Sequence, residues 1–364
     1  MNFDAQPLTG PVDRHEVAAF ARELRARGSL RPSGWSAFAV VIAVIVGAVV
    51  VPLTLIGTLM TLFTDPADLG RALLPAAVFV VIGVVALVVT VSGWRRSRVT
   101  RYRLSRFAAA NGMTYEPRIV DPPLPGMIFG LGHSRTATDL VRGTYPRFVE
   151  FGNHQYTVRH GKNSTTHRWG YVAVKLDVPL PNIVLDAKGN NGFGTNLPAS
   201  FHKAQRLSLE GDFDRYFDLY CPAGYERDAL YLFTPDIMAR FIDNAAELDV
   251  EIVDDWLFLY TRRKASSLDP ATWAWLFGAV GALLAKLDQW ARWRDERMPV
   301  ATASAPAPAD GALPFAAPVG MLTPPPGVAH EGRRLKRSAS WVTIVAAIAI
   351  GAVYIAMRIA DLAH

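Results

Sequence analysis

The chain has 364 residues, a formal net charge of +6 at pH 7 and a single cysteine, Cys221. This length has room for one sizeable domain together with membrane segments. One cysteine excludes an intrachain disulfide and any metal site built from several cysteines. The positive charge does not indicate nucleic-acid binding, because residues 107–270 hold 17 Lys/Arg against 20 Asp/Glu. A nucleic-acid binder would carry its basic surface on the folded domain.

Two long apolar runs lie in the first third of the chain. Residues 1–33 form a polar segment, in which we expect an amphipathic helix over 13–27. Residues 35–63 and 73–94 then contain no charged side chain. About 20 apolar residues are enough to cross a bilayer core, so both runs are predicted to be transmembrane helices. The second helix is expected to continue past the membrane and to stop at Asn111-Gly112.

Basic residues border these runs on their outer ends, whereas the link at 64–72 carries two aspartates and one arginine. A third apolar run, 339–357, is just long enough to cross a bilayer. The positive-inside rule places the basic flanks in the cytoplasm. We therefore expect a multi-pass plasma-membrane protein with residues 95–267 in the cytoplasm, and the lipid bilayer as a partner. The flanking basic residues are Arg95, Arg96, Arg98, Arg333, Arg334, Lys336 and Arg337.

Residues 95–267 have the pattern of an α+β soluble domain attached to the transmembrane helices, with mostly antiparallel short strands and two or three helices on one face. Gly152-Asn153 is a hairpin signal that would place Phe151 opposite His154. Residues 115–132 are rich in proline and glycine and are predicted to be irregular loop. The predicted strands are 148–151, 154–159, 167–178, 183–185, 207–210, 249–253 and 256–261.

The stretch 207–260 carries the clearest helix signals. Asp212 is placed to cap a helix over 212–220, and Thr234-Pro235 is placed to begin another. Cys221 is expected to be a small buried residue. The expected apolar faces are Phe213, Tyr216, Phe217 and Tyr220 on the first helix, and Ile237, Met238, Phe241 and Ile242 on the second.

This stretch resembles a family of uncharacterised bacterial membrane proteins of actinobacterial type, and the resemblance covers roughly residues 35–262. In that family the domain follows two transmembrane helices, so the resemblance implies this architecture and supplies no catalytic residue. The third apolar run departs from the family's arrangement. The matching positions are Leu209, Glu210, Phe213, Phe217, Phe233, Thr234, Pro235 and Met238.

Two segments follow the domain. Residues 268–297 are apolar at first and basic later, and the 14 apolar residues at 272–285 are too few to span a bilayer comfortably. We expect an amphipathic helix that lies on the membrane or packs on the domain, with Trp273, Trp275, Trp290 and Trp293 suited to an interface. Residues 298–332 are rich in proline and alanine and are predicted to be a disordered linker.

His160 and His167 are the metal-ligand candidates. If their strands pair symmetrically about residues 161–166, the imidazoles face each other, as in the beginning of a zinc site. His154 would lie roughly 20 Å away along the strand and would not complete the site. The pattern favours a polar hairpin tip, and no cofactor is predicted.

An acidic tract begins at Glu210, Asp212, Asp214 and Asp218, and residues 210–255 hold 13 acidic and three basic residues. Helix capping and attraction between the two halves of the domain explain it; a cation site or a surface for a basic partner is the alternative. We therefore predict a membrane-anchored binding or scaffold domain for a protein, a lipid headgroup or another copy of the chain. The alternatives are an enzyme that uses the tract from Glu210 to Asp218, and a component of a transport system.

Overall fold

The computed structural model describes part of the chain: residues 3–28, 52, 56–57, 69–161, 163–177, 179–180, 182–190, 197–198, 206–209, 212–221, 229–230, 233, 235–245 and 247–297. The chain divides into two compact units, one of residues 1–29 and 99–328 and the other of residues 30–98 and 329–364. Most of the first predicted span, the predicted linker at 298–332 and the predicted third span at 339–357 lie outside the described residues.

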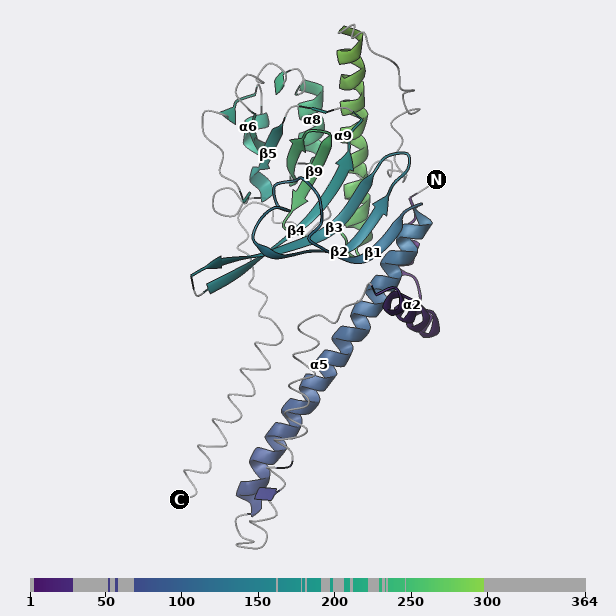
Figure 1. The fold of residues 1–364 in the computed structure, drawn as a ribbon, viewed down its shortest axis with the longest axis vertical. Coiled ribbons are helices and arrows are strands. Elements are labelled where there is room, and N and C mark those ends of the chain that lie inside the picture. The colour runs from purple at the N-terminus through teal and green to yellow at the C-terminus, as the bar shows by residue number, and fades with distance from the viewer. Residues whose placement is uncertain are drawn as a thin grey trace. The chain divides into compact units, whose positions relative to one another are not determined.

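The first unit is built on a nine-stranded antiparallel sheet with the strand order β1-β2-β3-β4-β9-β8-β5-β7-β6 (Figure 1). This confirms the expected α+β class. The strands are β1 (Thr114–Val120), β2 (His133–Gly143), β3 (Val149–His160), β4 (Asn163–Lys175), β5 (Ile183–Ala187), β6 (Arg206–Leu207), β7 (Phe217–Tyr220), β8 (Asp249–Val253) and β9 (Trp256–Thr261).

The β8–β9 hairpin is confirmed with the predicted bounds, and Asp254 in its turn has a φ of 52°. The predicted turn at Gly152-Asn153 is wrong, because β3 runs through it without a break and pairs with β4 over its whole length. Gly152 serves a different purpose there. A Cβ at this position would lie 2.7 Å from the hydroxyl oxygen of Tyr171, so the glycine makes room for that ring.

Three strands were not predicted. β1 and β2 pair with each other, which reduces the predicted loop to residues 121–132. The predicted helix over 212–220 is also wrong, because α6 (Phe213–Tyr216) is a single turn and β7 follows it. Pairing with β5 satisfies the backbone of β7, and its residues alternate between buried and half-buried. Asp212 occupies the N-cap position without making a side-chain capping hydrogen bond.

The helices of this unit are α1 (Gln6–Thr9), α2 (Arg14–Ala26), α8 (Pro235–Ala245), α9 (Pro270–Arg297) and the end of α5 (Leu69–Ala110), and a short 3-10 helix covers Lys188–Asn190. α2, α9 and the end of α5 lie close to the predicted residues, whereas α1 was not predicted. Asp13 caps α2 by accepting from the His15 backbone N–H at 2.9 Å. Gly112 ends α5 as predicted, with a φ of 72°.

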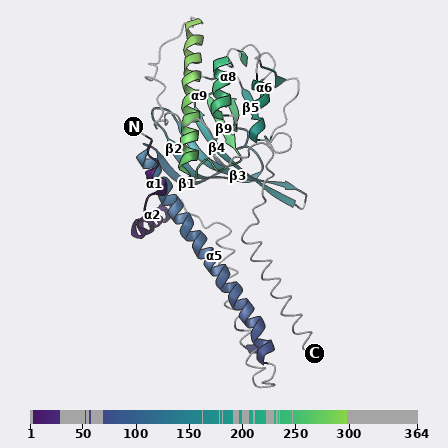
Figure 2. The same ribbon diagram turned by 180° about the vertical axis from the view of Figure 1, so that it is seen from behind.

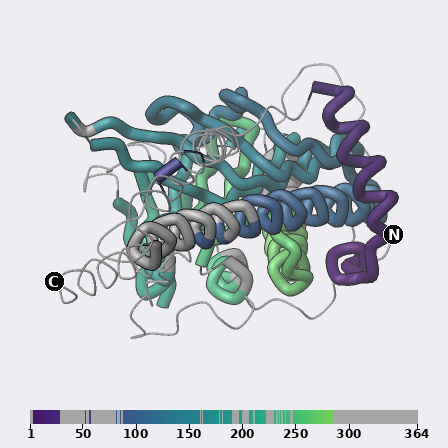
Figure 3. The backbone as a smooth tube through the Cα atoms, turned by 90° about the horizontal axis from the view of Figure 1, so that it is seen from below, coloured from purple at the N-terminus to yellow at the C-terminus, as the bar shows by residue number. Residues whose placement is uncertain are grey.

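α2 lies beside the end of α5 (Figure 3). The ring of Phe20 packs edge-on against Tyr102, with centroids 5.8 Å apart, and the Tyr102 hydroxyl donates to Glu16. Within the described residues, we find no helix that is both long and apolar enough to cross a membrane.

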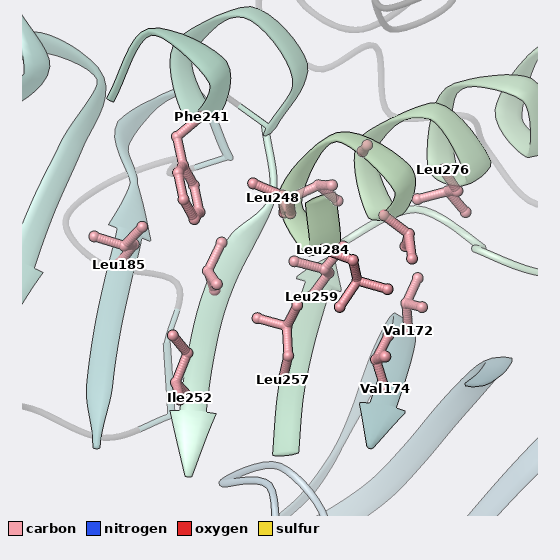
Figure 4. Packing of buried hydrophobic residues seen from close by; sticks show 14 of the residues in the cluster. Val172, Val174, Leu185, Phe241, Leu248, Ile252, Leu257, Leu259, Leu276 and Leu284 are labelled. Atoms are coloured by element: carbon pink, nitrogen blue, oxygen red, sulfur yellow. The ribbon is translucent and has the colours of Figure 1, made fainter. Parts of the chain in front are cut away.

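α8 and α9 cover one face of the sheet (Figures 1 and 2). Figure 4 shows Leu276 and Leu284 of α9 packed over Val172, Leu257 and Leu259 of the sheet. α9 therefore packs on the domain at its N-terminal half, which was one of the two expectations for it.

The interfacial role expected for Trp273 and Trp275 is wrong, because both side chains are buried in this core. The Trp273 ring lies 4.6 Å from Phe107 and 5.4 Å from Phe151, between centroids. Large rings bury more apolar area in such a core than at a surface. The side chains of Trp290 and Trp293 lie outside the described residues.

Candidate functional site

The other face of the sheet carries a second, aromatic core. It is formed mainly by β3, β4 and β9, and residues 121–132 cover it by placing Ile128 and Phe129 in its centre. Phe129 packs edge-on against Tyr171, with centroids 5.0 Å apart. The Pro/Gly-rich loop of the sequence is thus the lid of a core, and a glycine lets its backbone approach the sheet closely. Gly126, for example, lies where a Cβ would come within 3.1 Å of the Phe258 ring.

A network of three polar side chains, two of them buried, lies at one end of this core. Glu150 in β3 is 1% exposed and accepts from the Tyr171 hydroxyl at 2.6 Å. Its other oxygen accepts from Nε of Arg142 at 2.7 Å. Burial, and then the charge of Glu150, raise the pKa of Tyr171 well above its usual value, which keeps the phenol protonated as a donor.

A second glutamate fixes the lid to the sheet. Glu251 in β8 accepts from the Tyr260 hydroxyl at 2.5 Å and from the backbone N–H of Met127 at 2.8 Å. Burial raises the pKa of Glu251, and these two hydrogen bonds act in the opposite direction. Both glutamates are therefore hydrogen-bonded parts of the domain interior, and neither is presented to solvent as a free acid.

A groove of about 270 Å³ opens beside the first network. Its walls are apolar, and its polar lining is the Arg142–Glu150 pair. Arg142 keeps 29% of its side chain exposed and Glu150 only 2%. The remaining lining residues are Ile119, Pro122, Pro123, Leu124, Phe148 and Trp256.

The size and charge of the groove decide what it can hold. Pockets for drug-sized ligands and cofactors run from about 300 to 1,000 Å³, so this groove suits a smaller group, such as one aromatic ring or a short acyl segment. The arginine is neutralised by its buried partner, which favours an uncharged group that accepts a hydrogen bond. We call this site the lid groove.

The histidine candidates are not brought together. His160 pairs with Asn163, and His167 pairs with Tyr156, so the expected symmetric arrangement of the two histidines is wrong. The strands turn tightly at Gly161, which has a φ of 60°, so His160 pairs with a residue four positions before His167. The His167 ring stacks on Tyr156 with centroids 5.1 Å apart. In the described part of the chain, no three potential ligand side chains lie together as a metal site.

His154 is the histidine that the sequence gave no reason to choose. It is 1% exposed and lies beside Phe129 under the lid. Burial, and to a lesser extent the charge of Arg135, lower its pKa to about 4. Residues 150, 152, 154 and 156 recur at every second position of the strand, and this spacing is the signal that places them on one face.

The described acids of the acidic tract do not converge on one point. Asp218 pairs with Arg206 at 2.6 Å and with Lys188 at 3.2 Å. Asp214 accepts from the Ser208 hydroxyl and Asp212 pairs with Arg215 at 3.3 Å. Ion pairs and local hydrogen bonds thus account for these side chains. Glu210 lies outside the described residues.

The other predicted motif residues are part of the helix-covered core. Phe213 stacks on Phe217 with centroids 5.1 Å apart, and Met238 and Cys221 are buried. Pro235 begins α8 as predicted, and Thr234 lies outside the described residues. Arg95, Arg96 and Arg98 belong to α5, where the Arg98 guanidinium lies 3.4 Å from the Trp94 ring centroid. Arg333, Arg334, Lys336 and Arg337 lie outside the described residues.

The first unit is an α+β domain, and the lid groove is a small apolar pocket on it. No protein-family model and no curated protein matches the chain. A comparison with solved structures matches the crystal structure of the mycobacterial trehalose monomycolate transport factor A, TtfA, with 12% sequence identity and a TM-score of 0.36. The match covers 53% of this chain and 94% of that chain. A similarity of this size supports no inference about function.

Proposed function

We propose that the chain is a membrane-anchored binding protein, whose α+β domain lies in the cytoplasm and holds one apolar group of its partner in the lid groove. The proposed anchor rests on the charge-free runs at 35–63 and 73–94 and the apolar run at 339–357, with their basic flanks. The proposed binding role rests on the lid groove, since its apolar walls and neutral ion pair suit a ring or acyl segment.

Catalysis by the acidic tract is less well supported. The described members of the tract are already held by Arg206, Lys188, Arg215 and Ser208, and a catalytic acid needs access to a substrate. Glu150 at the lid groove and Glu251 under the lid both accept hydrogen bonds from tyrosine hydroxyls. A binding site therefore accounts for more of the observed side chains than an active site does.

Methyl benzoate, an apolar ring with an uncharged acceptor, is a suitable probe of the lid groove. The full-length chain is labelled with 5-fluorotryptophan in detergent micelles, and the Trp256 resonance is assigned by Trp256→Phe. A selective shift of the Trp256 fluorine resonance then reports binding in the groove. Partition of the probe into the micelle alone would not shift one tryptophan resonance selectively. Methyl benzoate has ten heavy atoms. If each contributes about 0.4 kcal/mol of binding free energy, the expected Kd is about 1 mM.

We expect the Trp256 resonance to move with methyl benzoate and the Trp273 resonance, from the helix-covered core, to stay in place. Leu124→Phe fills the groove and should abolish the shift. Leu230→Phe adds the same ring at a position that is 52% exposed and should preserve it. An immobile Trp256 resonance, or equal shifts in both variants, would refute the proposal.

A further inference from the structure

β3 and β4 extend past the rest of the sheet as a two-stranded arm (Figure 1). The last pair between β2 and β3 is His133 with Thr157, and the last pair between β9 and β4 is Thr261 with Gly170. Beyond these pairs, Val158–His160 have Asn163–Thr165 as their strand partners, and Thr166–Trp169 have His154–Thr157 of β3. We call residues 158–169 the basic ribbon.

The basic ribbon is rich in positive charge and has no acidic residue. Residues 151–176 contain Arg159, Lys162, Arg168 and Lys175, and no aspartate or glutamate. The first residues after β9 add Arg262, Arg263 and Lys264 beside the base of the ribbon, where Thr261 pairs with Gly170. Within the described part of the chain, neither Arg159 nor Arg168 has an acidic partner. Positive charge is therefore concentrated at one end of a domain whose overall charge is negative.

Core packing does not explain the outer part of the ribbon. Residues 163–166 are exposed, and they are Asn, Ser, Thr and Thr. An isolated two-stranded hairpin is only marginally stable in water, so an arm of this kind adds little to the stability of the domain. At its base, the Arg262 guanidinium lies 3.7 Å from the centroid of the buried Trp169 ring, which anchors this cation at the surface.

We propose that the basic ribbon binds the anionic phospholipid surface of the bilayer, as a second contact of the domain with its membrane. Lys and Arg side chains near an anionic leaflet each contribute about fivefold to binding. Ser and Thr hydroxyls and the open strand edges add donors for phosphate oxygens. This contact is separate from the lid groove, and the choice of a bilayer as partner rests on the proposed anchor.

A nucleic acid is the competing polyanion, and two observations disfavour it. The aromatic rings at the base of the ribbon are covered, since Tyr156 is stacked on His167 and Trp169 lies under Arg262, and they offer no free surface for base stacking. The acidic half of the same domain, residues 210–255, would also repel an extended polyanion.

The test uses the full-length chain in nanodiscs of pure phosphatidylcholine. Capture of these nanodiscs by vesicles is measured with vesicles of pure phosphatidylcholine and with vesicles that contain 30% phosphatidylglycerol. The ribbon variant is Arg159→Gln/Arg168→Gln, and a second variant, Thr165→Glu, places an acid on the ribbon and keeps both arginines. The matched control, Arg118→Gln/Arg215→Gln, removes the same charge from exposed positions elsewhere in the domain.

We expect the wild type to be captured by the anionic vesicles alone. Capture should fall about 30-fold in the ribbon variant and several-fold in Thr165→Glu, and it should change little in the control. Equal capture by both vesicles, or equal loss in the ribbon variant and the control, overturns the proposal. Binding of a labelled 20-base-pair DNA through the ribbon, without capture by vesicles, also overturns it in favour of a nucleic acid. Failure of the chain to insert into nanodiscs would instead refute the proposed anchor, and the same capture assay would then be run on the chain in solution.

Discussion

Replacing His154 with leucine tests whether the buried imidazole makes the stability of the domain depend on pH. His154 is 1% exposed under the lid, and its pKa is lowered to about 4. In the unfolded chain a histidine titrates near 6.5. The folded state therefore binds fewer protons than the unfolded state between these two values, so stability must fall as the pH falls through this window.

The size of this loss of stability follows from the shift in the pKa of His154. A difference of about 2.5 pKa units at about 1.4 kcal/mol per unit gives a loss of about 3 kcal/mol in the free energy of unfolding between pH 7 and pH 4. With a urea dependence of about 2 kcal/mol per molar, the midpoint should move by about 1.5 M. The raised pKa of Glu251 acts with the opposite sign and is common to the wild type and the variant.

The assay is urea unfolding of the full-length chain in detergent micelles at several pH values, followed by tryptophan fluorescence. The wild type should lose about 3 kcal/mol more stability than His154→Leu between pH 7 and pH 4. His15→Leu, which removes an exposed histidine from α2, should behave as the wild type. An identical pH dependence in the wild type and His154→Leu would refute the reasoning that burial controls this group.

Two further substitutions test the sheet and the helix-covered core. Gly170→Ala should destabilise the domain by more than about 2 kcal/mol, because its Cβ would overlap the backbone carbonyl oxygen of Arg263. At Gly161 a Cβ would meet no atom within 4 Å, so Gly161→Ala should cost only about 1 kcal/mol, for the positive φ. Thermal unfolding of the two variants compares them directly. Trp273→Ala should lower the free energy of unfolding by about 3–5 kcal/mol if the ring lies in the core, and by less than 1 kcal/mol if it lay at a membrane surface. The matched control is Trp256→Ala, which truncates a half-buried ring at the groove.

Patterns that depend on neighbours in sequence were predicted well. The β8–β9 hairpin, the stop of α5 at Gly112 and the start of α8 at Pro235 follow from local backbone chemistry, which is readable from a few residues.

The errors occurred where a distant part of the chain decides the outcome. Phe213–Tyr220 has helical spacing, yet β7 forms in its second half because β5 supplies a ladder of hydrogen bonds. Gly152 has the chemistry of a turn residue, yet it lies within a strand because the Tyr171 ring needs the space. The lid groove was not predicted for the same reason, since its lining comes from β1, β2, β3, β9 and the loop after β1.

The sequence by itself determined the α+β class, the end of α5, the start of α8 and the charge pattern on which the proposed anchor rests, because these depend on residue type and on spacing within a few turns or strands. Only the tertiary structure decided which residues share a site. It buried His154 and Trp273, paired Glu150 with Tyr171, separated His160 from His167, and extended the basic ribbon past the sheet. Strand order and register bring together residues far apart in the chain, and side-chain burial follows from these long-range pairings.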